Sequence, residues 1–408
     1  MADNKDKKVL NVPALRFPEF SGEWKKLRLS DFATKITKKN KGNIVKNVLC
    51  NSANLGLVPQ GNYFDREIAN TENTDGYYVI CNGDFVYNPR KSTAAPFGPV
   101  NIYEGEDAGI ISPLYLCFSV HNIFPKFLYY RFKSSAWHSY VYSHGDSGVR
   151  FDRVSIKDDV FFDMPIYKPA QDEQIKIATL LQLIDDRIST QNKIIEKYES
   201  LIQAMCDTLI ERETQQVILS FSDFGQSYSG LSGKSAEDFG EGYPFITYMN
   251  VYQNRIIDSK DVGFVKINKA EQQSVVRYGD ILLTLSSETP EEVGMGAVYL
   301  GETYPLYLNS FCFGIHITND AKIYPPFLAY YVSSQSFRKA VYPLAQGSTR
   351  FNLQKSDFMK KRFSFPVIEK QRKIYSILKA YSDKLIVEKL IMRLLCNQKC
   401  YLLRQLFI

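Results

Sequence analysis

Several short stretches of this chain gather side chains that suit contacts to phosphate groups and base edges. Arg, Lys, Asn, Gln, Ser and Thr are the residue types that proteins use for those contacts. A solvated surface loop is the alternative for each stretch. The candidate residues of the first half are Lys38, Lys39, Lys41, Asn51, Asn54, Arg90, Lys91, Ser92 and Arg150. Those of the second half are Lys234, Ser235, Tyr248, Asn250, Gln346, Ser348, Thr349 and Arg350.

An arginine followed by phenylalanine occurs at matching places in the two halves. Gly148–Phe151 contains Arg150, and Ser348–Phe351, with Gly347 just ahead, contains Arg350. A duplicated arginine flanked by Gly and Ser could clamp a phosphate or a guanine. It could equally anchor a turn through a structural salt bridge. Neighbouring Gln and Ser side chains add hydrogen-bonding groups, so we favour nucleic-acid contact.

The motifs of nucleotide and methyl-transfer chemistry fail on inspection. Gly230–Ser235 resembles a phosphate-binding loop, but Tyr228 stands where the first glycine is required. No Gly-x-Gly-x-x-Gly follows a predicted strand, which argues against a dinucleotide site. Asn88-Pro89-Arg90 lacks the Asn-Pro-Pro-aromatic form of an amino-methyltransferase. We therefore predict that the chain has no catalytic centre of its own.

Metal-binding and nucleophilic patterns are also missing from the sequence. Cys396 and Cys400 lie one helical turn apart, with no His or further Cys nearby to complete a zinc site. The four His residues form no ligand spacing, and no Ser–His or Cys–His pairing can be justified. We expect no metal and no cofactor on this chain.

Composition sets broad limits. The 408 residues suffice for two domains, and 27 Tyr and 27 Phe against 2 Trp favour β-rich layers. A formal charge of +6 permits nucleic-acid binding without requiring it. Seven Cys is an odd number, the N-terminus is polar, and no run approaches the roughly 18 apolar residues of a membrane span. We expect a cytoplasmic protein without a membrane partner.

The chain repeats itself at an offset of about 200 residues. Five matches occur in the same order, which indicates duplication of a domain and a following element. Gly148–Phe151 with Ser348–Phe351 is one of them. The others are Pro125–Tyr130 with Pro326–Tyr331, Asn82–Asp84 with Tyr278–Asp280, Phe162–Pro165 with Phe363–Pro366, and Glu173–Ile177 with Lys370–Ile374.

The element that follows each domain is a long helix. Apolar residues alternate at spacings of four and three, which is the heptad pattern of a coiled coil; an ordinary amphipathic core helix is the alternative. The first seam is Ile177, Leu181, Ile184, Ile188, Ile195, Tyr198, Ile202, Met205 and Leu209, with Gln191 as a polar member. The second is Ile374, Leu378, Tyr381, Leu385, Met392, Leu395 and Leu402, with Glu388 and Lys399 as polar members.

Charge predicts that these two helices pair with each other. Residues 171–213 hold five Lys and Arg against nine Asp and Glu, a net charge of −4. Residues 369–408 hold nine against three, a net charge of +6. At 1.5 Å per residue each helix would span about 60 Å. An antiparallel pair would place the two globular domains at opposite ends of a rigid rod, which would act as a ruler.

The predicted fold class is α+β, with two mixed β-rich domains, two long helices in an antiparallel coiled coil, and pseudo-two-fold symmetry from the duplication. The predicted domains are residues 1–168 and 214–367. The predicted helices are residues 169–213 and 368–408.

These residues also resemble a known family. Pro13–Trp24 looks like the start of type I restriction-modification specificity subunits, and so do the helix beginnings at Pro169–Ile177 and Pro366–Ile374. The second beginning departs from the family pattern, with Lys370 where the first has Glu173. Gly230–Ser235 together with Tyr248–Val251 resembles the opening of a target-recognition domain.

The resemblance implies a reader of double-stranded DNA that is not itself an enzyme. Two target-recognition domains would each read one half of an asymmetric bipartite site. The helices would fix the gap and dock two methyltransferase subunits, and restriction subunits could join. S-adenosylmethionine, ATP and Mg would lie on those partners, which would flip and methylate adenine. A fused nuclease-methyltransferase and a protein-binding scaffold are the competing hypotheses.

Overall fold

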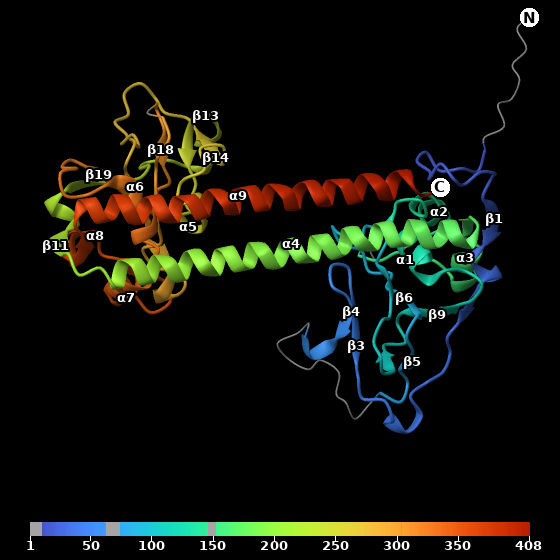
Figure 1. Ribbon diagram of the computed structural model, residues 1–408. Coiled ribbons are helices and arrows are strands. Elements are labelled where there is room, and N and C mark those ends of the chain that lie inside the picture. Colours follow the sequence, from blue (N-terminus) through green and yellow to red (C-terminus); the bar gives the residue numbers. More distant parts are fainter. Residues whose placement is uncertain (1–9, 63–73, 146–151, 303) are drawn as a thin grey trace, which may run out of the picture. The chain divides into compact units, whose positions relative to one another are not determined.

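The computed structural model describes residues 10–62, 74–145, 152–302 and 304–408 (Figure 1). The chain forms two compact units: unit 1 contains residues 1–191 and 391–408, and unit 2 contains residues 192–390. Both combine helices with several small sheets, so the predicted α+β class is confirmed. Each unit includes one segment of each long helix, because that segment packs on the globular part of the same unit.

Unit 1 is built around a four-stranded sheet with the order β2-β9-β6-β7. Smaller antiparallel pairs join β1 to β10, β3 to β4 and β5 to β8. Its strands are β1 (Lys25–Arg28), β2 (Ala33–Lys35), β3 (Leu49–Ser52), β4 (Gly56–Pro59), β5 (Tyr78–Ile80), β6 (Phe85–Tyr87), β7 (Val100–Ile102), β8 (Gly109–Ile111), β9 (Leu116–Val120) and β10 (Pro165–Lys168). Its short helices are α1 (Pro125–Lys133), α2 (His138–His144), α3 (Asp158–Phe162), η1 (Leu29–Asp31), η2 (Lys41–Asn43) and η3 (Gln60–Asn62).

Unit 2 repeats this plan with the sheet β12-β19-β15-β17 and adds the sheets β14-β13-β18 and β16-β21-β20. Strands β11 and β22 pair as β1 and β10 do. The strands are β11 (Gln216–Ser220), β12 (Gly225–Ser229), β13 (Phe239–Ile246), β14 (Val262–Val265), β15 (Ile281–Thr284), β16 (Ser286–Ser287), β17 (Gly296–Val298), β18 (Tyr307–Leu308), β19 (Cys312–Ile317), β20 (Ala345–Gln346), β21 (Phe351–Leu353) and β22 (Arg362–Pro366). The short helices are α5 (Tyr248–Gln253), α6 (Pro325–Tyr331), α7 (Gln335–Val341), α8 (Lys355–Lys360), η4 (Phe221–Asp223), η5 (Ala236–Asp238), η6 (Pro290–Glu292) and η7 (Tyr342–Leu344).

The core of each unit joins its sheet to the long helices. In unit 1, Phe85 and Phe118 of the sheet and Phe127 of α1 lie in one buried cluster with Leu181 and Leu402. In unit 2, Phe313 and Phe327 lie in the matching cluster with Ile202 and Leu378. Strands β6 and β15 are buried along their whole length, which explains their continuous apolar sequences.

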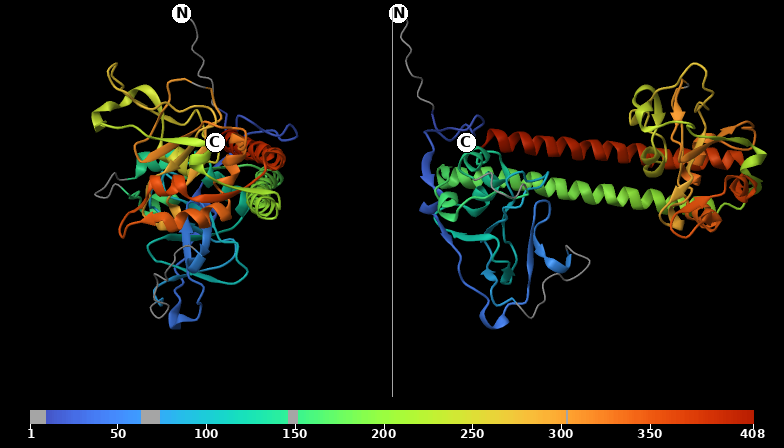
Figure 2. Two further views of the ribbon diagram at one scale, coloured as in Figure 1. Left: turned by 90° about the vertical axis from the view of Figure 1, so that its left-hand side faces the viewer. Right: turned by 180° about the vertical axis from the view of Figure 1, so that it is seen from behind.

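The long helices are α4 (Gln171–Glu211) and α9 (Ile368–Gln405), and each is drawn without a break in Figure 1 and in the right-hand view of Figure 2. Helix α4 begins in unit 1 and ends in unit 2, and α9 does the reverse, so their segments run antiparallel within each unit. All the apolar seam residues predicted from the heptad pattern are buried or half-buried. Among the described residues, no helix combines the length and apolar character that a membrane span requires.

Opposite charges meet along these helix pairs, as the sequence predicted. In unit 1, Asp185 of α4 lies 2.5 Å from the Lys399 ammonium of α9. In unit 2, Glu199 lies 2.6 Å from the ammonium of Lys389. Lys399 was predicted as a polar seam member, and its ion pair explains why a lysine is tolerated there.

A glutamine at the start of each long helix holds the preceding domain. Gln174 Oε1 accepts a hydrogen bond from the Phe124 backbone N–H (2.9 Å), and its Nε2 donates to the Pro169 carbonyl (2.8 Å). Gln371 makes the same two bonds in unit 2, to Tyr324 N–H (2.8 Å) and to the Pro366 carbonyl (2.7 Å). Both glutamines are buried, so these bonds satisfy groups that water does not reach.

An ion pair with exchanged charges stands beside each of these glutamines. In unit 1, Arg16 makes a bidentate pair with Glu173, with both N–O distances 2.8 Å. In unit 2, the Lys370 ammonium lies 3.1 Å from Glu213. Arg16 corresponds to Glu213 and Glu173 to Lys370, each at an offset of 197 residues, so acid and base are interchanged between the two units. The ion pair explains why Lys370 departs from the family pattern, because its partner is the acidic Glu213 where the partner of Glu173 is the basic Arg16.

The Arg16–Glu173 pair gives a stability prediction. Arg16→Glu would place a carboxylate against Glu173, which is 1% exposed, and should lower the free energy of unfolding of unit 1 by about 3–5 kcal/mol. Both Trp residues, Trp24 and Trp137, lie in unit 1, so urea titration followed by Trp fluorescence reports on this unit.

The matched control is Arg28→Glu, which breaks an exposed pair with Asp163 and should cost about 1 kcal/mol or less. Combining Arg16→Glu with Glu173→Arg should recover much of the lost stability. Equal urea midpoints for Arg16→Glu and Arg28→Glu would contradict the prediction.

Candidate nucleic-acid interface

The hairpin between β20 and β21 presents four of the predicted contact residues of unit 2. Gln346, Ser348, Thr349 and Arg350 are all exposed on it. The hairpin is held to β16, where Ser286 pairs with Asn352 and Ser287 with Phe351. The structure therefore brings together the residues that the sequence repeat singled out around Arg350.

Gly347 makes the tight turn of this hairpin possible. Its φ is +142°, and a Cβ atom there would lie 2.1 Å from the Arg350 carbonyl oxygen. Any side chain at this position would therefore force the backbone apart at the residue whose guanidinium is presented. The Gly ahead of Ser348–Phe351 is thus a conformational requirement.

Aromatic side chains flank the arginine of this hairpin. The Arg350 guanidinium lies 6.0 Å from the centre of the Phe311 ring, which is 54% exposed. The Tyr248 hydroxyl donates to the Ser286 carbonyl (2.9 Å), and its ring stacks on Tyr252. Burial raises the pKa of Tyr248, so this hydroxyl stays protonated and keeps donating at neutral pH. Tyr248 is therefore tied to the strand that carries the hairpin.

Unit 1 presents its basic loop at the equivalent edge. Arg90 forms a β-bridge with Arg153, and the Lys91 N–H donates to the Asp152 carbonyl (2.8 Å). The Val154 N–H donates to the Pro89 carbonyl, as the Leu353 N–H does to Leu285 in unit 2. Arg90, Lys91 and Ser92 are exposed, and the Ser92 hydroxyl accepts from the Ala95 N–H within the loop. Arg150 lies outside the described residues.

An aromatic residue accompanies the arginines in this unit too. Burial raises the pKa of Tyr115, while the positive charges of Arg90 and Arg153 act in the opposite direction. Tyr115 precedes β9 at the position that Phe311 holds before β19. Sequence reasoning missed Tyr115, Phe311 and Arg153. The repeat contained the signal, since these aromatic residues stand 196 positions apart.

The lysines of the first half lie on an exposed loop that is attached to β5. Lys38, Lys39 and Lys41 are all exposed. The Lys38 carbonyl accepts from the Val79 N–H (2.9 Å), and Lys39 forms a bridge with Tyr78. The backbone of this loop is thus fixed while the ammonium groups remain free to reach a ligand.

Two predicted asparagines are structural, which corrects the sequence interpretation. Asn51 is 6% exposed, donates to the Val86 carbonyl and accepts from Asn101. Asn250 is fully buried and donates to the carbonyls of Asp258 and Asp261. Both amides are used inside the protein and are not available to a base edge.

Lys234 and Ser235 are also occupied locally. The Lys234 side chain is 4% exposed and its ammonium lies 2.5 Å from Glu271. Ser235 begins η5, where its hydroxyl and N–H both bond to Asp238. The polar residues that resembled a phosphate loop thus stabilise the turn that contains them.

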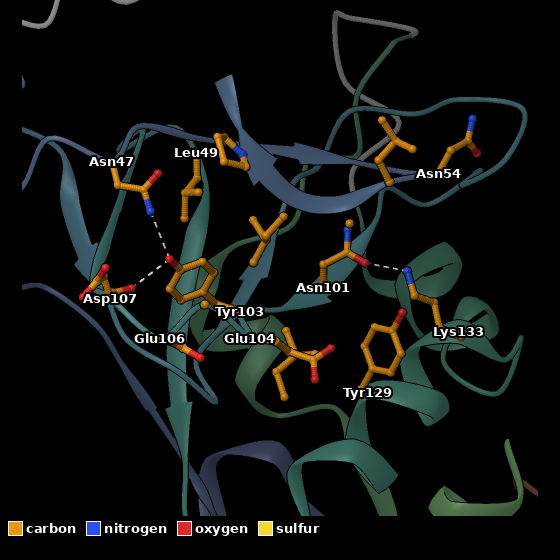
Figure 3. Close-up of a pocket in the computed structure, with 16 residues that line it drawn as sticks. Asn47, Leu49, Asn54, Asn101, Tyr103, Glu104, Glu106, Asp107, Tyr129 and Lys133 are labelled. Carbon is orange, nitrogen blue, oxygen red and sulfur yellow. Dashed lines mark hydrogen bonds between the residues drawn. The ribbon is translucent and has the colours of Figure 1, made fainter. Parts of the chain in front are cut away.

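Asn54 is exposed in the β3–β4 turn and lines a pocket of about 600 Å³ (Figure 3). The wall of this pocket includes the acidic residues Glu104, Glu106 and Asp107. The surroundings of Asn54 therefore do not favour a phosphate group. Within the described part of the chain, no cluster of three or more His, Cys, Asp and Glu side chains could hold a metal ion.

Comparison with known proteins assigns the second half of the chain. Residues 222–394 match the family model of the type I restriction modification DNA specificity domain. This part of the chain is therefore similar to a type I restriction-modification DNA specificity domain. The matched region includes the Arg350 hairpin, Tyr248 and Phe311, so the exposed surface of unit 2 described above lies within it. The predicted resemblance is confirmed by this match.

Solved structures show a similar fold over nearly the whole chain. One comes from work on complex assembly and conformational transition of the type I R-M system, with 14% identity, a TM-score of 0.60, and 93% of this chain and 96% of that chain covered. Another is the type I restriction-modification S subunit from M. genitalium, with 16% identity, a TM-score of 0.54, and 97% and 99% covered. No curated protein gives a significant match.

The hairpin of the specificity domain gives a prediction. Gly347→Val should distort the turn and lower DNA affinity about as much as Arg350→Ala, because both remove the guanidinium from its position. The measurement is fluorescence anisotropy with DNA containing the recognised sequence. Gly233→Val is the matched control, because Gly233 has a positive φ of +66° but lies in the local turn of Lys234. Equal affinity for the Gly347 variant and the unchanged protein would contradict the role of the hairpin.

Proposed function

We propose that this chain is the DNA-specificity subunit of a type I restriction-modification complex and reads a split, asymmetric DNA sequence. The observation that carries the proposal is the match of residues 222–394 to the DNA specificity domain, on a fold that is repeated in the first half. The chain directs adenine methylation or ATP-dependent restriction, and partner subunits carry out both reactions.

The proposed DNA contacts lie at the same edge of each unit. In unit 2 they are Gln346, Ser348, Thr349 and Arg350, with Tyr248 and Phe311 beside them. In unit 1 they are Arg90, Lys91 and Ser92, together with the lysine loop at Lys38–Lys41. Arginine and glutamine fit guanine and adenine edges, and lysine and serine fit phosphates. Arg150 remains a candidate through its repeat position.

The two edges differ in chemistry, which supports two different half-sites. Where unit 1 has Arg90 and Lys91, unit 2 has Ser286 and Ser287 in β16. The same backbone location therefore exposes two cations in unit 1, whereas in unit 2 it holds two buried serines, and the Ser287 hydroxyl donates to Glu292. A duplicated fold with divergent contact residues would read an asymmetric sequence.

The long helices are proposed to fix the gap between the half-sites and to dock two methyltransferase subunits. The ion pairs between the acidic α4 and the basic α9 favour one register of pairing. Restriction subunits join in the full complex. S-adenosylmethionine, ATP and Mg are proposed to bind those partners, and this chain holds no cofactor and performs no catalysis.

The first test is an adenine-methylation map of a host that lacks such systems. The cognate methyltransferase subunit is expressed with and without this chain. A split motif with a fixed gap, methylated only when the chain is present, is the expected result. An unchanged map, with both proteins soluble and associated, would favour a protein-binding scaffold instead.

Arg350→Ala tests which half unit 2 reads. We expect relaxed recognition at one or two positions of one half-site if the guanidinium reads a base, with about 1–3 kcal/mol lost there. If it contacts a phosphate, affinity should fall for all sequences and the salt dependence should decrease by about one ion. Arg362→Ala, an exposed arginine on β22, is the control. Equal loss at both half-sites would contradict the assignment of one domain to each half.

Lengthening the helices tests the ruler. Insertion of one heptad into both α4 and α9 adds about 10 Å, which corresponds to about three base pairs. The methylation map should then show a longer gap with both half-sequences unchanged. Insertion into α4 alone is the control and should abolish methylation, because the seams no longer match. A gap of unchanged length in the double insertion would exclude the ruler.

A further inference from the structure

Unit 1 contains a groove between β4 and the outer edge of β7, shown in Figure 3. We call it the β7 groove. Its volume is about 600 Å³. One wall is formed by the β3–β4 hairpin, the other by β7 and the turn after it, and helix α1 closes the side. The residues used below are Ile102, Glu104, Glu106, Asp107, Tyr129 and Lys133.

The backbone of Ile102 faces this groove. Strand β7 is the last strand of its sheet, and Ile102 stands opposite Phe85 of β6. The adjacent Tyr103 donates its N–H to the Asp84 carbonyl, so Ile102 occupies the alternate, non-hydrogen-bonded position of the ladder. Its N–H and carbonyl therefore point outward. No backbone partner for them is found among the described residues.

Unit 2 shows which kind of segment can pair with such a strand edge. Val298 of β17 is the counterpart of Ile102, and a segment of the chain, Arg255–Ile257, lies parallel beside it. The Val298 N–H donates to the Arg255 carbonyl and the Ile257 N–H donates to the Val298 carbonyl, both at 3.0 Å. An extended peptide thus fills, in unit 2, the place that no described segment occupies in unit 1.

In unit 1, the ammonium of Lys133 takes the place that the Arg255 guanidinium has in unit 2. Arg255 donates to Ser333 and Gln203 and lies over the Tyr330 ring. Phe124 and Tyr324 bond to the equivalent glutamines at an offset of 200, one residue less than the predicted pairing of Pro125–Tyr130 with Pro326–Tyr331, so Lys133 stands at the position of Ser333. The Lys133 ammonium bonds to Asn101 and lies 5.0 Å from the centre of the Tyr129 ring. Burial and the nearby charge of Lys399 lower the pKa of Lys133 to about 8. A visiting peptide would therefore not place its basic residue at Lys133.

Negative charge lies farther along the groove. A strand parallel to β7 would continue past Glu104, Glu106 and Asp107, which are all exposed. Only Glu104 is engaged by a neighbouring cation, Lys126 at 2.6 Å, among the ion pairs of the described residues. DNA phosphates would be repelled here, whereas lysine or arginine side chains would be attracted.

We propose that the β7 groove is a docking site for an extended segment of a partner protein that adds in parallel to β7, with apolar residues beside Ile102 and basic residues following them opposite Glu104–Asp107. This is strand addition to an open sheet edge, in which backbone bonds give affinity and side chains give selectivity. The inference does not depend on the proposed DNA reading, and its test uses neither DNA cleavage nor methylation.

The test uses a labelled synthetic peptide and the full chain. The peptide has the sequence of Gln253–Ile257, the segment that fills the matching edge of unit 2, with Arg255→Ala so that no cation faces Lys133, followed by three arginines. We expect saturable binding by fluorescence anisotropy, with slower hydrogen exchange at the Ile102 amide. The same peptide ending in three glutamates should bind at least about tenfold more weakly.

Two variants separate the groove from general charge attraction. E104Q/E106Q/D107N should weaken binding about tenfold or more, whereas E237Q/E302Q/D320N, which removes three exposed carboxylates of unit 2, should not. Ile102→Pro removes the outward N–H at an edge where proline is tolerated and should also weaken binding.

Three results would overturn the proposal. They are equal binding to the two triple variants, absence of saturable binding, and protection of the Ile102 amide by a DNA duplex instead of by the peptide. Unfolding of the Ile102→Pro variant would not affect the outcome, because the carboxamide variants decide it.

Discussion

One buried glutamine side chain holds each globular part of this protein, Gln174 in unit 1 and Gln371 in unit 2. Each accepts a bond from the backbone N–H just before a short core helix, α1 or α6, and donates to a carbonyl just before its own long helix. A buried amide with both ends satisfied fixes the direction in which the helix leaves the domain. The aromatic cores then pack against the first turns of that helix, and the exposed edges that carry the arginines take their positions from the same sheet.

The duplicated units show which parts of the fold are constrained and which are free to diverge. The sheet order, the glutamine bonds and the aromatic residue before β9 or β19 are retained. The residues at one matching strand position differ, with exposed Arg90 and Lys91 in unit 1 and buried Ser286 and Ser287 in unit 2. The edge at Ile102, which Arg255–Ile257 fills in unit 2 and no described segment fills in unit 1, is a further divergence. A common scaffold thus supports different surface chemistry.

The helices, the repeat and the fold class could be predicted from the sequence because their signals are local or periodic. Heptad spacing identifies a buried seam without knowledge of distant partners. The candidate site was predicted only in part. Asn51, Asn250 and Lys234 are polar residues in loop-like sequence, but their partners Val86, Asp258 and Glu271 lie 8 to 37 positions away. Local sequence does not reveal such bonds. Phe311, which is exposed, and Tyr115, which is half-buried, were missed because such an aromatic residue beside a strand has the same sequence pattern as a core residue.

The exchanged ion pairs have a consequence for how such chains diversify. Arg16 and Glu173 lie on either side of the sheets of unit 1 in the sequence, and Glu213 and Lys370 lie on either side of those of unit 2. Each pair belongs to the flanking segments and not to the domain between them. Genetic replacement of residues 25–168 or 216–366 would therefore leave the matched charges in place. Recombination between the two halves with a break point inside those flanks would instead bring two like charges together, Glu173 with Glu213 or Arg16 with Lys370, so the ion pairs define the borders of an exchangeable cassette.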